Sequence, residues 1–118
     1  MLTSGELCSS MLKMIYANVF EILDKLENTK KWIEEQKPQT PEEEQVIFLV
    51  KFQVESVTKK LQKFAKYCSE VIANYPLEPC KAYKMVSKKF YKLRKILDIA
   101  YALAAFEGDK DETGQTSE

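Results

Sequence analysis

The chain has 118 residues, 45% of which are hydrophobic, and its 18 Lys and Arg residues balance its 18 Asp and Glu residues. This length is enough for one domain with a hydrophobic core, and no apolar run is long enough to span a membrane. The absence of histidine excludes Ser-His-Asp and Cys-His catalytic groups, as well as zinc sites that contain histidine.

Four prolines divide the chain into three segments. Pro38 and Pro41 lie at the first division, and Pro76 and Pro79 lie at the second. Proline has no backbone N–H to donate and disfavours helix in the residue before it, so each pair marks a corner. The segments between the corners show helical spacing of apolar residues, which predicts an all-α protein.

The first segment has a looser pattern than the other two. A capping box formed by Thr3 and Glu6 would begin a helix that continues to about Gln36. Its apolar stripe consists of Leu7, Met11, Ile15, Val19, Ile22, Leu26 and Ile33. Asn28 and Thr29 could interrupt this stripe, and a break near Asn28 would give a bundle of four helices instead of three.

The second segment begins with a strong helix-start signal. Thr40 is the expected N-cap, Pro41 occupies the first helical position, and Glu43 completes a capping box. Between Ile47 and Val71 the apolar residues follow at alternating steps of three and four. This is the spacing of a helix-bundle seam.

The third segment repeats that spacing from Pro79 to about Phe106. Long helices joined by short corners must fold back on one another. We therefore predict an antiparallel three-helix bundle of long helices as a domain of residues 1–106. Residues 107–118 are polar, net acidic and without periodicity, which predicts a disordered acidic C-terminal tail.

The three cysteines are Cys8, Cys68 and Cys80. Their odd number and the lack of C-x-x-C spacing suggest neither a disulfide framework nor a zinc site, so we expect small buried apolar residues. Glu21 and Asp24 are a weak candidate for a magnesium site, because solvation alone explains surface carboxylates. Glycine-rich phosphate-binding motifs are absent, and no secretory signal is evident. We expect a cytoplasmic (intracellular) protein without catalytic residues, metal or cofactor.

Basic residues are concentrated in the middle of the chain. Residues 51–95 contain twelve Lys and Arg against three Asp and Glu, whereas residues 1–50 have a net charge of −4 and residues 96–118 of −5. Antiparallel packing would bring most of these cations to one half of the bundle. The candidate residues for binding nucleic acid or an acidic partner are Lys59, Lys63, Lys66, Lys84, Lys88, Lys92, Arg94 and Lys95. The alternative is a solvated lysine face, although such faces normally interleave both signs.

The other half of the predicted bundle has more apolar residues than a three-helix core needs. The helix is apolar nearly all round from Val46 to Phe52, and the end of the third helix becomes apolar where lysines lay before. The candidate residues for association are Trp32, Phe48, Phe52, Ile99, Leu103 and Phe106. Either the first helix, or a short fourth one, covers this surface within the monomer, or a partner does.

These patterns predict a non-enzymatic interaction protein that self-associates, as a homo-oligomer, or serves as a small subunit of a larger complex. The alternative is an accessory protein that binds nucleic acid through phosphate contacts without reading sequence. A membrane role is not expected, because the lysine-rich helix keeps its apolar residues on the opposite face for its own core.

Overall fold

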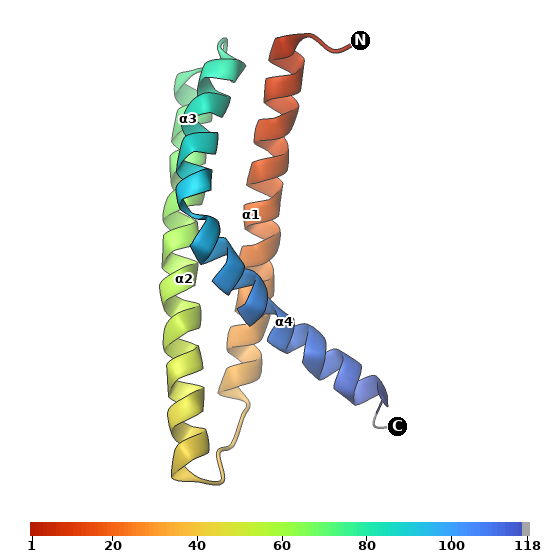
Figure 1. Cartoon of the computed structure of the whole chain (residues 1–118), viewed down its shortest axis with the longest axis vertical. Coiled ribbons are helices and arrows are strands. Elements are labelled where there is room, and N and C mark those ends of the chain that lie inside the picture. Colours follow the sequence, from red (N-terminus) through yellow and green to blue (C-terminus); the bar gives the residue numbers. More distant parts are fainter. Residues whose placement is uncertain (117–118) are drawn as a thin grey trace.

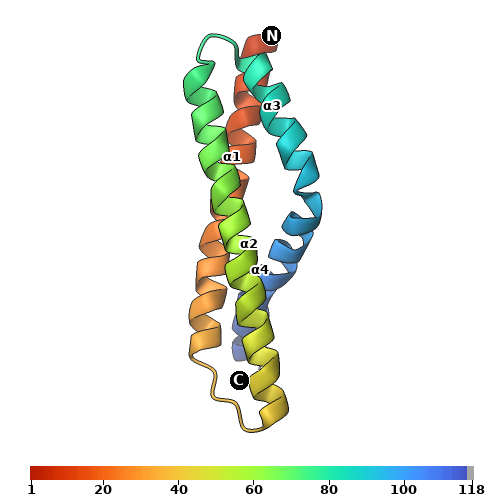
Figure 2. The same cartoon turned by 90° about the vertical axis from the view of Figure 1, so that its left-hand side faces the viewer.

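The computed structural model describes residues 1–116, with side chains for residues 1–106. These residues form four α-helices and no strand: α1 (Ser4–Glu34), α2 (Pro41–Asn74), α3 (Pro79–Lys92) and α4 (Arg94–Thr116). The molecule is elongated, with extents of 56 × 29 × 19 Å, and α1 and α2 follow its long axis in opposite directions (Figure 1, Figure 2). The predicted all-α class is confirmed, but the predicted third helix is two helices.

Helix α1 is continuous, so the alternative break near Asn28 does not occur. Thr3 caps it as expected, because the Thr3 hydroxyl oxygen accepts from the Glu6 N–H at 3.1 Å. Thr29 is fully buried and fits the regular spacing of the α1 core residues, which are Leu12, Ile15, Val19, Ile22, Leu26, Thr29 and Ile33. The Thr29 hydroxyl lies 3.1 Å from the carbonyl oxygens of both Lys25 and Leu103, so this buried donor has a partner.

Helix α2 starts at Pro41 with Thr40 as its N-cap, as the sequence predicts. The Glu43 N–H donates to the Thr40 hydroxyl oxygen at 3.1 Å. The Glu43 carboxylate accepts from the Gln39 N–H at 2.7 Å instead of from Thr40 itself, so the second half of the expected capping box shifts by one residue. The core residues of α2 are Val54, Val57, Leu61, Phe64, Ala65, Cys68 and Val71.

The third segment bends at Leu93, between α3 and α4. Leu93 has φ −90° and ψ 3°, outside ordinary helix geometry, and its N–H reaches the carbonyl oxygens of both Lys89 and Phe90. The bend carries α4 across α1 instead of further along α2 (Figure 1). Ala100 is fully buried and Ala104 nearly so, and these small side chains allow the two helices to approach closely.

Phe64 on α2 lies 5.7 Å from Phe90 on α3, centroid to centroid, which fits the expected antiparallel register of these two segments. The core then continues across the bend, because Val86 on α3 and Leu97 on α4 are both buried in the same cluster. Helix α4 extends to Thr116. Side chains after residue 106 lie outside the described ones, so the predicted disordered acidic tail is not confirmed.

Candidate interaction surfaces

The N-terminal half of α2 presents large apolar side chains to solvent. Phe48 is 66% exposed and Phe52 is 63% exposed, while Val46 and Leu49 are also more than half exposed. We call these four residues the α2 apolar face. The opposite side of the same stretch packs on the core through Ile47 and Val50, which are half-buried. A helix that is apolar on both sides in this way has a second surface suited to a partner.

The bend at Leu93 explains part of this exposure. A straight third helix would continue alongside α2, but α4 turns toward α1 (Figure 1). Val46 and Leu49 on α2 remain more than half exposed. Phe48 and Phe52 lie on the outer side of α2, away from the core positions Val54 and Val57. No described helix therefore covers the α2 apolar face.

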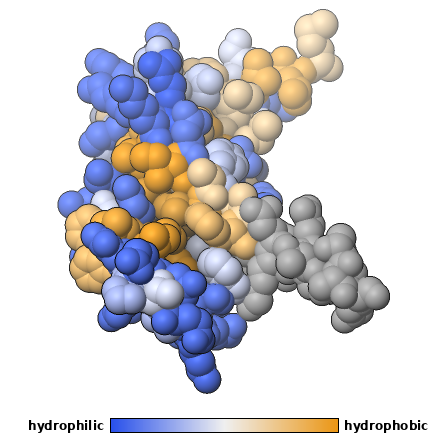
Figure 3. Space-filling view, turned by 60° about the horizontal axis from the view of Figure 1, so that its bottom comes forward, coloured by the Kyte–Doolittle hydropathy of each residue, from blue (hydrophilic) through white to orange (hydrophobic). Residues whose placement is uncertain are grey.

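A groove lies next to this face, at the end where α1 and α2 are joined. Trp32 on α1 stacks on Phe106 of α4 with ring centroids 5.8 Å apart, and both rings line the groove. Val46 belongs both to the groove wall and to the α2 apolar face. The groove has a volume of about 530 Å³. Figure 3 looks toward this end and shows hydrophobic side chains gathered in a patch that hydrophilic ones border.

The six predicted association residues do not form one surface. Phe48 and Phe52 belong to the α2 apolar face, whereas Trp32 and Phe106 form the groove. Ile99 is 39% exposed on α4, and Leu103 is only 7% exposed. Leu103 is a core residue whose carbonyl oxygen lies 3.1 Å from the Thr29 hydroxyl, so its place on an exposed patch is wrong. Val46 and Leu49 were not among the predicted residues, although steps of three residues along the helix connect Val46 to Leu49 and Leu49 to Phe52.

All eight predicted basic residues are exposed. Lys63 and Lys92 line opposite sides of a groove between α2 and α3. This groove has a volume of about 260 Å³. Phe64, Tyr67 and Leu93 also line this α2–α3 groove. Two further lysines, Lys60 and Lys89, complete its rim, and the sequence prediction missed both. The sequence could have indicated them, because Lys60 is three residues from Lys63 and Lys89 is three residues from Lys92, and side chains at this spacing are neighbours on a helix.

The other predicted basic residues lie around this groove or away from it. Lys66 is on the far side of α2, where it lines a cavity against α1 together with Asp24 and Glu27. Lys59 lies beside Phe52 and Glu55 on α2. The remaining residues lie along α3 and the start of α4: Lys84, Lys88, Arg94 and Lys95. None of the predicted basic residues forms an ion pair with a described side chain.

Aromatic rings occur among these cations. The Lys89 ammonium lies 4.4 Å from the centre of the Tyr67 ring, and the Arg94 guanidinium lies 4.6 Å from the centre of the Tyr91 ring. Tyr91 is 65% exposed, and its hydroxyl oxygen accepts from Arg94 at 3.0 Å. The same pairing recurs with Lys81 over Tyr75 at 4.8 Å. These contacts hold the cations in place without neutralising them.

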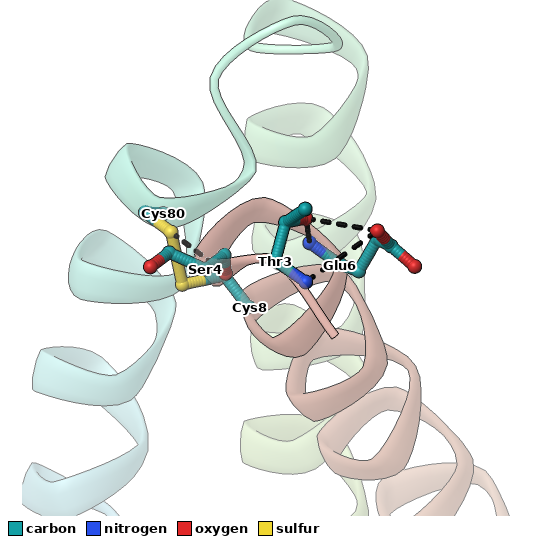
Figure 4. Close-up of a disulfide and its surroundings, with 5 residues drawn as sticks. All are labelled: Thr3, Ser4, Glu6, Cys8 and Cys80. Atoms are coloured by element: carbon teal, nitrogen blue, oxygen red, sulfur yellow. Dashed lines mark hydrogen bonds between the residues drawn. A yellow bond between two sulfur atoms is a disulfide. The ribbon is translucent and has the colours of Figure 1, made fainter. Parts of the chain in front are cut away.

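Cys8 and Cys80 form a disulfide that joins the second turn of α1 to the first turn of α3, with their Cα atoms 5.0 Å apart (Figure 4). The expectation that these two are separate buried thiols is therefore wrong. The Cys80 sulfur also lies 3.3 Å from the Ser4 carbonyl oxygen, to which only a reduced thiol would donate. Disulfides persist mainly in oxidising compartments, and the cytoplasmic location stays a prediction. Cys68 is buried, as expected, and burial raises the pKa of its thiol to about 11.

No protein-family model, curated protein or solved structure matches this chain. Over residues 1–116, no helix combines the length and apolar character that crossing a bilayer requires. The described residues also contain no group of three or more cysteines and carboxylates placed to hold a metal ion. The two surfaces that stand out are the α2 apolar face and the basic region around the α2–α3 groove.

Proposed function

We propose that this chain is a non-enzymatic interaction protein that self-associates through the α2 apolar face. The observation that carries the proposal is the two-thirds exposure of Phe48 and Phe52, one helical turn apart on an outward-facing surface. Apolar side chains that cluster in this way on a helix are typical of helix–helix interfaces. The absence of histidine supports the non-enzymatic part, because it removes the most common acid–base group.

A second copy of the chain is the partner that best fits the charges on this helix. Along α2 the surface changes from acidic at Glu42, through the α2 apolar face, to basic at Lys59 and Lys60. This order is complementary to itself when two copies of α2 lie antiparallel. A parallel pair would instead place like charges opposite each other at both ends.

A two-fold axis through the centre of the face gives a specific register. Glu42 and Lys60 lie about five turns apart on the same edge of α2, and two-fold symmetry keeps that edge on one side of the pair. Glu42 of one copy would then face Lys60 of the second copy, and the reverse contact would form at the other end. Between these contacts, Phe48 and Phe52 of the two copies would interleave near the axis.

The expected energy of this contact is dominated by the phenylalanines. Full burial of a Phe side chain contributes about 1.5–3 kcal/mol, so burying the two-thirds that is exposed contributes roughly 1–2 kcal/mol for each ring. The dimer would contain two copies of Phe48 and two of Phe52. Removing all four rings from the interface should therefore cost at least about 4 kcal/mol, which corresponds to a roughly 1,000-fold weaker dimer.

Light scattering coupled to size exclusion tests this function. Wild type should have twice the 13.7 kDa chain mass at high micromolar concentration, and a variant with both Phe48→Glu and Phe52→Glu should have the chain mass alone. Phe20→Glu is the matched control, because Phe20 is 48% exposed on α1 and should leave the dimer intact. A monomeric wild type, or a dimer that survives the double substitution, would refute the proposal.

A further inference from the structure

The surface around the α2–α3 groove is basic without compensating acids. Helix α3 contains no Asp or Glu, and on the facing part of α2 none occurs between Glu55 and Glu70. Phe64, Tyr67 and Leu93 provide the apolar lining of the groove. Four lysines surround it: Lys60, Lys63, Lys89 and Lys92. Like charges at this density repel one another, and this repulsion raises the electrostatic free energy of the free protein. A bound polyanion would reduce the repulsion.

The outer side of α3 extends this basic surface. Lys84, Lys88, Lys92 and Lys95 follow one another at helical spacing, with the exposed ring of Tyr91 between them. Phosphates repeat along a nucleic-acid strand, and the ammonium groups repeat along this helix. An acidic peptide would satisfy the lysines, but it would make no use of an exposed aromatic ring held beside Arg94.

We propose that the α2–α3 groove and the outer side of α3 bind single-stranded nucleic acid independently of its sequence. The lysines would contact successive phosphates, and Tyr91 would stack on an unpaired base. A duplex keeps its bases stacked on one another and cannot use Tyr91 in this way. Lys60 lines the groove and also faces Glu42 in the proposed dimer, so the two interactions share this residue. Lys88, Lys92, Lys95 and Tyr91 lie outside the α2 apolar face, and variants at these positions test nucleic-acid binding separately from self-association.

The test uses the full chain and a fluorescein-labelled 20-nucleotide oligothymidylate, with fluorescence anisotropy measured over a series of salt concentrations. Affinity should fall linearly with salt on a double-logarithmic plot. Replacing Lys88, Lys92 and Lys95 with Glu should weaken binding and reduce that slope by about 2, since each lost phosphate contact removes about 0.7. The control replaces Lys13, Lys25 and Lys31 of α1 with Glu, which changes the net charge equally and should preserve the slope.

A second pair of variants separates stacking from charge. Tyr91→Ala should weaken binding at least about fivefold at each salt concentration without changing the slope. Tyr101→Ala removes an equally polar ring that is 56% exposed on α4, and it should have no effect. Three results would each overturn the proposal: no binding at low salt, equal loss in the α1 control, or equal affinity for a duplex or for polyglutamate. Circular dichroism and light scattering confirm that each variant keeps its fold and mass.

Discussion

The bond between Cys8 and Cys80 should contribute a large part of the stability of this fold. It closes a loop of 72 residues that contains most of α1 and all of α2. In the chain-entropy description, a loop of this length restricts the unfolded state by about 4 kcal/mol, and native disulfides commonly contribute 2–4 kcal/mol. For a chain of this size, that change corresponds to a shift of roughly 10–15 °C in Tm.

The perturbation is a double substitution, Cys8→Ser with Cys80→Ser, compared with wild type that has been equilibrated with oxidised glutathione. Urea unfolding followed by circular dichroism should give a free energy of unfolding lower by about 2–4 kcal/mol for the variant. A reducing agent should destabilise wild type by a similar amount and leave the variant unchanged. In denaturant, oxidised wild type should titrate one free thiol, that of Cys68. Three free thiols, or unfolding that reduction does not change, would refute the reasoning.

Four other changes test the dimer contact, the buried thiol and the packing of α4. Glu42→Lys should weaken the dimer by about 2- to 30-fold, because two exposed ion pairs are lost, and adding Lys60→Glu should restore it in sedimentation equilibrium. Cys68 should resist iodoacetamide at pH 8 until urea unfolds the chain, since burial raises its thiol pKa to about 11. As the pH rises, the Cys68 thiol loses its proton in the unfolded chain before it does so in the folded protein, and this favours unfolding. The free energy of unfolding of wild type, relative to that of Cys68→Ala, should therefore fall by up to about 3 kcal/mol between pH 9 and pH 11. Ala100→Leu should destabilise the fold by about 1–3 kcal/mol in urea through overpacking against α1, whereas Leu at the exposed Ala102 should not.

Local sequence signals predicted the helix starts correctly. Thr3 and Thr40 cap α1 and α2, because capping depends on residues within one turn of each other. The seam of α2 was also predictable, since a regular alternation of three and four residues fixes which side of the helix is buried. In the same way, every predicted basic residue is exposed, as lysines opposite an apolar seam must be.

The bend at Leu93 could not be predicted from local signals. No proline or glycine lies near it, and the apolar spacing continues through it without a change. The bend places α4 on α1, where the Leu103 carbonyl oxygen lies 3.1 Å from the Thr29 hydroxyl, a contact between residues 74 positions apart. The assumption of a straight third helix also made the predicted association surface wrong, because a straight helix would have placed Leu103 and Phe106 level with Phe48.

The disulfide was missed for a similar reason. Cys8 and Cys80 are 72 residues apart, and nothing near either cysteine indicates its partner. Their proximity depends on α3 packing next to α1 with its first turn at the same end of the bundle, which is a property of the whole fold. The odd cysteine count has a simple explanation in the structure, because the third thiol, that of Cys68, is buried in the α2 seam.

The pairing of two α2 helices is the central claim, and chemical cross-linking tests it most directly. A mixture of ¹⁴N- and ¹⁵N-labelled chains would be treated with a zero-length reagent that joins carboxylates to amines, then digested and analysed by mass spectrometry. Glu42 and Lys60 lie about 27 Å apart along one helix, too far for such a link within a chain. The proposed dimer predicts a Glu42–Lys60 link between light and heavy peptides. Links confined to peptides of one isotope would contradict it.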